Sequence, residues 1–260
     1  MSKISLQMYT MREFTKTKED LESCVKELSE IGFKNLQYTV QPFMTVKETK
    51  ELFDKYDIKE DSDCISFYQI KDNLKRVEDG AKYFNTPYLR TDSMPREMTT
   101  VDGIKKFCQE ANEIGELLAP FGQKLLYHFH SYEFKNFDGF NGIDLFIKEL
   151  DHSLVHFQPD THWLQSGGVN PAEFIKENSD MITYVHVKDY AIGDREELLE
   201  STPKLYAPVG CGNLNWKSII SACRDINCKM YVIEQDNCYG ENPYKCVETS
   251  FKNLNMFGVE

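Results

Sequence analysis

Short apolar runs and amphipathic stretches alternate along the whole chain. Eight apolar runs predict β-strands near Ile4–Thr10, Lys34–Val40, Ile58–Ser66, Pro87–Thr91, Lys124–His130, Val155–Pro159, Ile182–Lys188 and Lys229–Gln235. Between them, apolar residues at helical spacing predict helices over Lys18–Ile31, Val46–Tyr56, Ile70–Phe84, Val101–Leu118, Ile143–Leu150, Pro171–Asn178, Trp216–Asp225 and Tyr244–Met256. The third strand is the least regular of the set.

This strict alternation predicts an α/β protein with a parallel sheet. Eight strand–helix units in 260 residues favour closure into a single-domain (β/α)8 TIM barrel over residues 1–260. The competing fold is an open, doubly wound sheet, which usually carries a glycine-rich turn after its first strand. The corresponding turn here, MREFTKTKED, contains no glycine, and no Gly-, Pro- or Ser-rich linker divides the chain.

The net charge limits the classes of binding partner, and the cysteine content indicates the cellular compartment. The net charge is −12 and the 30 Lys and Arg are scattered, so we expect no nucleic-acid partner and no anionic membrane partner. No apolar run approaches the ~20 residues of a membrane span. The eight cysteines form no CxxC pair, which argues against a zinc ribbon or a disulfide framework. Together with an N-terminus that lacks a secretory signal pattern, this predicts a cytoplasmic protein.

Polar residues gather where the last strands end, and in a barrel of this kind the active site lies at the C-terminal ends of the strands. Because side chains alternate along a strand, Asp160, His186 and Glu234 each fall on a definite face of strands six, seven and eight. A buried polar group without a partner costs on the order of 2–7 kcal/mol, and a charge costs more. A bound cation would satisfy all three residues. The alternative is a buried polar network that closes the barrel.

Strand five ends in YHFHSYEF. His128 and His130 share a face of this strand, whereas Glu133 would point the other way if the strand continued. We expect the chain to turn near Ser131, which would carry Glu133 over the mouth of the barrel.

Six short motifs in order carry a family resemblance over nearly the whole chain. They are LQMYTMRE, YHFHSYEF, PDTHW followed by GGVNP, HVKD, PVGCGNLNW and VIEQD. In this pattern the chain resembles the sugar phosphate isomerase/epimerase family of xylose-isomerase-like TIM barrels.

The resemblance implies one divalent metal ion held by Glu133, Asp160, His186 and Glu234. Carboxylates and an imidazole suit a hard-to-borderline cation, and we expect Mn²⁺ ahead of Mg²⁺, Co²⁺ or Zn²⁺. The ion would polarise a carbonyl and stabilise an enediolate, while Glu133 and Glu234 act as catalytic residues that remove and return a proton.

The substrate implied is a small sugar or sugar derivative. His130, His128 and Lys188 are expected to contact its hydroxyls or an oxyanion, with Trp163 and Tyr9 as apolar walls of the pocket. Homo-oligomerisation is left open by the sequence.

Some positions depart from the family pattern. Gln37 stands where many relatives carry Glu, Asp63–Cys64 where they carry His, and Trp163 where ketose epimerases carry His. We therefore expect altered substrate handling.

These features leave three hypotheses for the function and disfavour a fourth. A metal-dependent isomerase or epimerase is the first hypothesis. The second is a lyase or dehydratase acting on an inosose or 3-keto sugar at the same metal site. The third is a non-catalytic carbohydrate-binding barrel. A DNA-repair endonuclease is disfavoured, because it would need a basic face and more histidine ligands.

Overall fold

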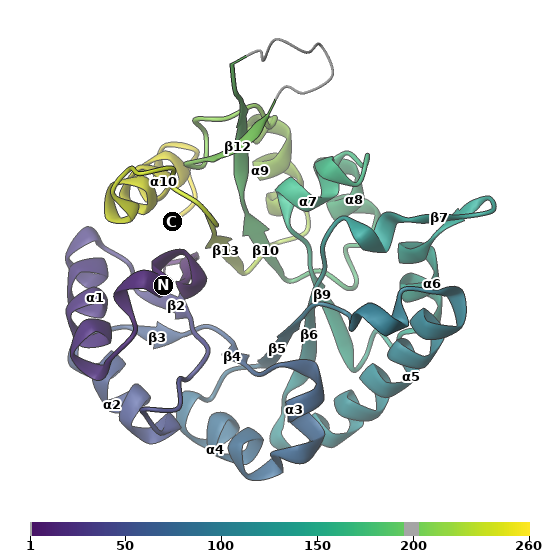
Figure 1. Ribbon diagram of the computed structural model, residues 1–260, viewed down its shortest axis with the longest axis horizontal. Coiled ribbons are helices and arrows are strands. Elements are labelled where there is room, and N and C mark those ends of the chain that lie inside the picture. The colour runs from purple at the N-terminus through teal and green to yellow at the C-terminus, as the bar shows by residue number, and fades with distance from the viewer. Residues whose placement is uncertain (1, 195–202) are drawn as a thin grey trace.

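In the computed structural model, which describes residues 2–194 and 203–260, parallel strands form a central ring surrounded by helices (Figure 1). The ring consists of β1 (Ile4–Gln7), β2 (Asn35–Gln37), β3 (Lys59–Glu60), β4 (Asp63–Cys64), β5 (Tyr88–Asp92), β6 (Lys124–His128), β9 (Val155–Gln158), β10 (Tyr184–Val187) and β13 (Met230–Ile233). The strands β3 and β4 together occupy the third position, where the sequence pattern is least regular. The predicted (β/α)8 barrel is therefore confirmed.

Two runs of paired strands make up the ring. Parallel hydrogen bonding orders them as β10–β13–β1–β2–β3 and β4–β5–β6–β9. The chain passes directly from β3 to β4 through Asp61 and Ser62. Only two isolated bridges, Phe157–Ile182 and Asp160–His186, connect β9 to β10. The seam between β9 and β10 is thus a thinly paired part of the described barrel.

The outer layer contains the predicted helices with small changes of boundary. They are α1 (Lys18–Ile31), α2 (Val46–Lys55), α3 (Phe67–Asp72), α4 (Leu74–Phe84), α5 (Val101–Leu118), α6 (Gly142–Glu149), α8 (Pro171–Glu177), α9 (Trp216–Asp225) and α10 (Pro243–Met256). The helix expected over residues 70–84 is divided at Asn73. A short helix that the sequence pattern did not predict, α7 (Thr161–Ser166), begins immediately after Asp160.

The first predicted strand is too long. It ends at Gln7, and Met8–Phe14 forms a 3-10 helix instead. The side-chain carbonyl of Gln7 accepts a hydrogen bond from the backbone N–H of Tyr9, which caps this helix. As a result, Tyr9 lies above the end of the strand and not within it.

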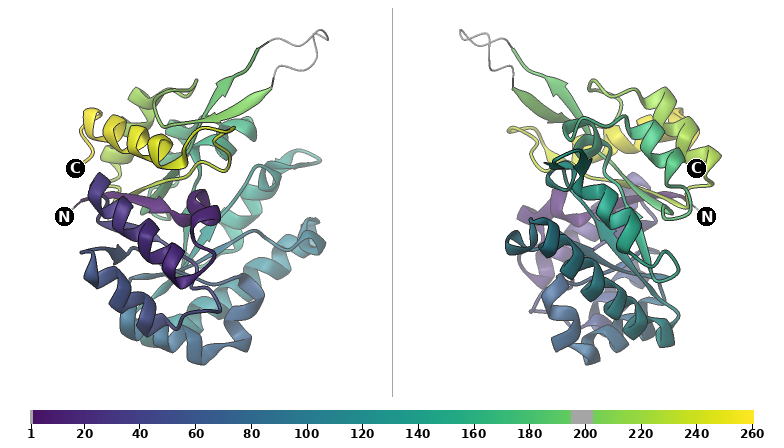
Figure 2. Two further views of the ribbon diagram at one scale, coloured as in Figure 1. Left: turned by 60° about the vertical axis from the view of Figure 1, so that its left-hand side comes forward. Right: turned by 90° about the vertical axis from the view of Figure 1, so that its right-hand side faces the viewer.

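The long connection after the seventh strand contains an antiparallel hairpin. Its strands are β11 (Asp189–Ile192) and β12 (Lys204–Ala207), and they project beyond the ring of helices (Figure 2). A smaller hairpin, β7 (Asn136–Phe137) with β8 (Phe140–Asn141), follows the fifth barrel strand. Among residues 2–194 and 203–260, no helix is both long enough and apolar enough to cross a membrane.

Candidate functional site

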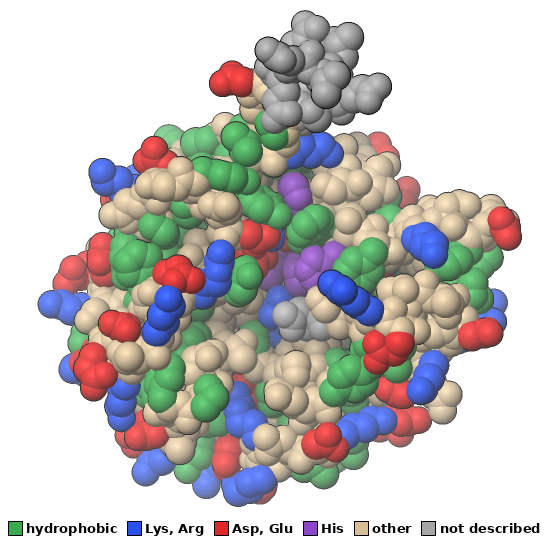
Figure 3. Space-filling view, in the orientation of Figure 1, with side chains coloured by type: hydrophobic (Ala, Val, Ile, Leu, Met, Phe, Trp, Pro, Cys, Tyr) green, Lys and Arg blue, Asp and Glu red, His purple; other side chains and the backbone are tan. Residues whose placement is uncertain are grey.

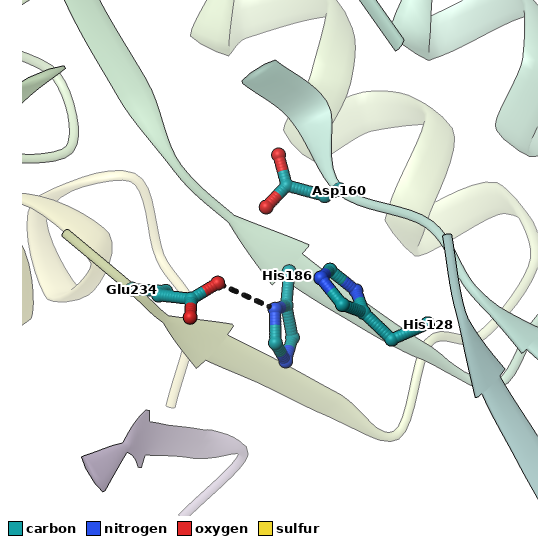
Figure 4. A group of neighbouring side chains, drawn as sticks. All are labelled: His128, Asp160, His186 and Glu234. Carbon is teal, nitrogen blue, oxygen red and sulfur yellow. Dashed lines mark hydrogen bonds and ion pairs between the residues drawn. The ribbon is translucent and has the colours of Figure 1, made fainter. Parts of the chain in front are cut away.

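Four side chains from four neighbouring barrel strands converge at one end of the ring (Figure 4). They are His128, Asp160, His186 and Glu234, and their ligand-type atoms all lie within 4.8 Å of one another. All four side chains are buried. The group joins the ends of β6, β9, β10 and β13, which is the end of a barrel where active sites lie.

Strand register brings these residues to the same level. His128 pairs with Gln158 across β6 and β9, Asp160 bridges to His186, and His186 pairs with Val232 across β10 and β13. Alternate residues of a strand share a face, and these residues all fall on the strand faces that point into the ring.

The two carboxylate oxygens of Asp160 differ in their hydrogen bonding. Its Oδ1 accepts hydrogen bonds from the backbone N–H groups of His162 and Trp163, at 2.8 and 3.0 Å, and so caps α7. Its Oδ2 is buried and has no hydrogen-bond partner. Burial raises the pKa of Asp160 to about 8, opposed by the charge of Lys188. A buried carboxylate oxygen without a donor is costly, and a cation beside it would remove that cost.

His128 presents a free lone pair to the cluster. Its Nδ1 lies 3.2 Å from the backbone carbonyl of Gln158, which can only accept. The proton therefore resides on Nδ1 and leaves Nε2 as an acceptor or metal ligand. Burial lowers the pKa of His128 well below its usual value, with a further contribution from the charge of His186, so the ring is neutral at physiological pH.

His186 has a hydrogen-bond partner at each ring nitrogen. Its Nδ1 lies 3.0 Å from Oε2 of Glu234, and its Nε2 lies 2.7 Å from the side-chain carbonyl of Gln37. Burial lowers the pKa of His186, partly opposed by the charge of Glu234.

Lys188 brings a positive charge to the rim of the cluster. Its Nζ is 3.3 Å from Glu234, 3.8 Å from Asp160 and 2.8 Å from Asp236. Burial alone would lower the pKa of Lys188, but these carboxylates outweigh burial and hold the pKa above its usual value. Likewise, burial would raise the pKa of Glu234, yet Lys188 and His186 hold it well below normal. Lys188 and Glu234 are therefore both charged at neutral pH.

A cavity of about 350 Å³ opens above the cluster. Its lining residues are Gln7, Tyr9, Thr39, Arg90, His128, His130, Lys188, Glu234 and Asp236. Figure 3 shows histidine, acidic and basic side chains gathered in the hollow at the centre of this face. The size lies at the lower end of the range for small-molecule sites, and the polar lining suits a ligand with many hydroxyl groups.

The structure brings together most of the residues expected from the sequence. Asp160, His186 and Glu234 meet as predicted. His130, Tyr9 and Lys188 line the cavity. Trp163 is not among its lining residues, but its ring lies 5.3 Å from Nζ of Lys188 and supports that side chain.

Glu133 does not join the cluster. Tyr127 Oη donates to its Oε1 at 2.5 Å, and the backbone N–H of His130 donates to its Oε2 at 3.0 Å. Tyr127 stacks on Phe146 of α6 and so points out of the ring. Glu133 is buried in the turn after β6, and burial raises its pKa to about 7. His128 occupies the place in the cluster that was expected for Glu133.

Two charged residues of the cavity were not anticipated as site residues. Arg90 lies on β5 and donates to Gln158 at 2.9 Å, and Asp236 follows Glu234 at the same strand end. The sequence carried a signal for both. Asp236 shares a strand face with Glu234, and Arg90 is a charged residue within an apolar strand.

Fold and site together define a (β/α)8 barrel with a buried His–Asp–His–Glu cluster at the C-terminal ends of its strands. Residues 69–245 match the family described as xylose isomerase-like TIM barrel, and the chain belongs to this family.

Comparison with individual proteins agrees with that membership. An inosose dehydratase from Geobacillus kaustophilus is 33% identical over 100 residues, which cover 38% of this chain but only 28% of the relative. A sugar phosphate isomerase/epimerase from Parabacteroides distasonis has a similar structure, with a TM-score of 0.77, 20% identity, and coverage of 97% of this chain and 93% of that one. A xylose isomerase-like TIM barrel protein from Mycobacterium smegmatis, in complex with magnesium, has a TM-score of 0.73 at 14% identity, covering 98% of this chain and 96% of that one.

Proposed function

We propose that His128, Asp160, His186 and Glu234 hold one divalent metal ion, and that the protein is an enzyme acting on the keto form of a small polyhydroxylated substrate. The observation that carries this proposal is the convergence of four buried ligand-type side chains around Oδ2 of Asp160, which has no hydrogen-bond partner. Two imidazoles and two carboxylates suit a borderline cation, with Mn²⁺ first and Mg²⁺, Co²⁺ or Zn²⁺ as alternatives. The magnesium complex of the Mycobacterium smegmatis protein supports a divalent ion.

When bound, such an ion polarises a carbonyl and stabilises the negative charge that develops when a neighbouring C–H proton leaves. The side chains at the rim would handle that proton. Glu234 is an ionised carboxylate at the cavity wall, so it is placed to accept it. Lys188 is held protonated next to Glu234 and Asp236, and its Nζ is placed to donate a proton to a departing oxygen.

The arrangement favours elimination over epimerisation. Epimerisation needs a second acid–base group on the opposite face of the substrate, and Glu133 was expected in that role. Glu133 instead forms hydrogen bonds with Tyr127 and with the backbone of His130, away from the cavity lining. Elimination needs one base and one acid, which Glu234 and Lys188 would provide. The likeness to an inosose dehydratase supports a lyase of the dehydratase type, with an isomerase or epimerase as the alternative.

The test combines metal binding with product analysis. Mn²⁺ uptake is measured calorimetrically for the wild-type protein, for Asp160→Ala with Glu234→Ala, and for the control Asp225→Ala, which alters an exposed carboxylate. The Mn²⁺ protein is then incubated in D₂O with an inosose, a 3-keto glucoside and a ketose, and the products are followed by NMR and mass spectrometry.

Loss of one water from a keto substrate is the expected result. Deuterium incorporation without loss of a group would establish the epimerase alternative. If the protein binds metal and sugar but catalyses neither elimination nor epimerisation, it is a non-catalytic carbohydrate-binding barrel. No Mn²⁺ uptake by the wild-type protein, or equal uptake by the double variant, would refute the metal site.

A further inference from the structure

The side-chain amide of Gln37, at the end of β2, has all of its hydrogen-bonding capacity in use. Its carbonyl Oε1 lies 3.0 Å from Nε2 of Gln7 and 2.7 Å from Nε2 of His186. Its Nε2 donates to Oδ1 of Asp61 at 3.2 Å and to Oγ of Ser62 at 2.7 Å. All of these residues are buried, so a broken contact would leave an unsatisfied polar group.

The orientation of this amide is fixed from both sides. On one side, Asp61 offers only acceptor oxygens, so it requires the NH₂ group of Gln37. On the other side, Gln7 has its own orientation set, because its Oε1 accepts from the backbone N–H of Tyr9 at 3.1 Å. The Nε2 group of Gln7 must then point at Gln37 and requires its carbonyl. Rotating the Gln37 amide by half a turn would break both arrangements.

This orientation dictates where the proton of His186 resides. The carbonyl of Gln37 cannot donate, so Nε2 of His186 must carry the hydrogen of the 2.7 Å contact. In a neutral ring, Nδ1 then bears a lone pair, and that lone pair faces Oε2 of Glu234 at 3.0 Å. Nζ of Lys188 already lies 3.3 Å from the same oxygen, and a metal ion beside Nδ1 would use the lone pair that Nδ1 presents.

We propose that Gln37 is a positioning residue that holds His186 in the Nε2–H tautomer, so that Nδ1 is directed, unprotonated, at the cation site. This inference rests on the proposed metal-binding function. A carboxylate at position 37 would not serve equally well, because its second oxygen would face Asp61 and could not donate to Ser62. The amide is therefore required by the partners that surround it. Groups that fix the orientation of a metal-binding histidine typically change metal affinity by about 10–100-fold when they are removed.

The primary measurement is ¹⁵N NMR of the histidine rings in metal-free protein, with His186 assigned by its loss in His186→Gln. We expect an unprotonated Nδ1 and a protonated Nε2 in the wild-type protein. In Gln37→Leu the constraint is gone, so the proton is expected to move to Nδ1 and bond Glu234. Mn²⁺ affinity should then fall by about tenfold or more. The matched control is Gln41→Leu, because Gln41 is only partly buried and its side chain donates to the backbone of Thr39, away from His186; both readouts should stay at wild-type values.

A second variant, Asp61→Asn, tests the same inference in case Gln37→Leu does not fold. Asp61→Asn can donate to Gln37, so it permits the amide to rotate, and a mixture of His186 tautomers is expected. A proton on Nδ1 in the metal-free wild-type protein would overturn the inference even if Mn²⁺ binds normally. Unchanged tautomer and affinity in Gln37→Leu would overturn it as well. By contrast, a wild-type protein that shows the Nε2–H tautomer but takes up no Mn²⁺ would refute the proposed metal site while leaving the assignment of Gln37 intact.

Discussion

At the residue scale, His128 lies in the cluster where Glu133 was expected, and this difference depends on structure that the sequence pattern does not encode. Asp160, His186 and Glu234 could be placed from strand parity alone, because each stands at the end of a predicted strand. Glu133 was placed by resemblance, and its position depends on how the chain leaves β6. The 3-10 turn Tyr132–Phe134 and the hydrogen bond from Tyr127 direct it away from the ring. His128 had the correct parity, but only the register of β6 against β9 shows that it reaches the cluster.

The buried position of Glu133 predicts a pH-dependent cost to stability. Burial raises its pKa from 4.5 to about 7, so the folded state binds this proton more tightly than the unfolded chain. Stability from this group is complete below about pH 4.5 and is lost as the pH rises to about 7, by on the order of 3 kcal/mol. Glu133→Gln cannot ionise. The free energy of unfolding of the variant, relative to wild type, should therefore rise between about pH 4.5 and about pH 7.

Urea unfolding of both proteins at several pH values measures this difference. Other titrating groups contribute to both proteins, so they cancel in the comparison. A difference between the two proteins that is independent of pH would contradict the buried, proton-binding carboxyl.

At the element scale, helices were more predictable than the strands and connections that shape the site. The boundaries of α1 and α5 match their predictions because both have an apolar stripe and a threonine N-cap, Thr17 and Thr100. The division of the third strand into β3 and β4 depends on pairing with different neighbours, which the local pattern does not encode. The hairpin β11–β12 was likewise missed, because its pairing is antiparallel within a connection that was expected to lack strands.

One residue anchors that unpredicted connection to the barrel. Asp189 is fully buried at the start of β11, and its carboxylate accepts hydrogen bonds from the backbone N–H groups of Tyr190, Gly210, Gly212 and Leu214 and from Nε1 of Trp216. Gly212 is required there, since a Cβ would lie 2.4 Å from Oδ1 of Asp189. The run at residues 210–213 is thus a turn built around a carboxylate, and the side chain of Asn215 caps α9.

Asp189→Asn should therefore destabilise the protein strongly. An amide offers one acceptor oxygen, so its NH₂ group would face donors that remain buried, at a cost of about 2–4 kcal/mol. Because Lys188 precedes Asp189, the mispositioned strand should also weaken ligand binding in the cavity. Chemical denaturation measures the loss, with Asp225→Asn at an exposed site as the control. A loss no larger than that of the control would show that Asp189 is not the anchor.

At the scale of the whole molecule, the candidate metal site lies across the least-paired seam of the described barrel. The strands β9 and β10 share only two isolated bridges, and one of these joins Asp160 to His186. A cation bound by both residues would therefore connect the two halves of the ring where backbone pairing is sparse. Binding to the folded state alone stabilises it in proportion to the logarithm of ligand excess.

Metal binding should consequently raise the thermal stability of the entire barrel. Free Mn²⁺ at about 100 times its Kd adds about 2.7 kcal/mol, which raises Tm by roughly 5–10 °C for a domain of about this size. Hydrogen exchange should slow most at the seam, where the amides of Phe157 and His186 donate to Met181 and Pro159. Calorimetry with and without EDTA measures the first effect, and exchange mass spectrometry the second. Asp160→Ala should abolish both while Asp225→Ala keeps them, and an equal shift in Asp160→Ala would place the ion elsewhere.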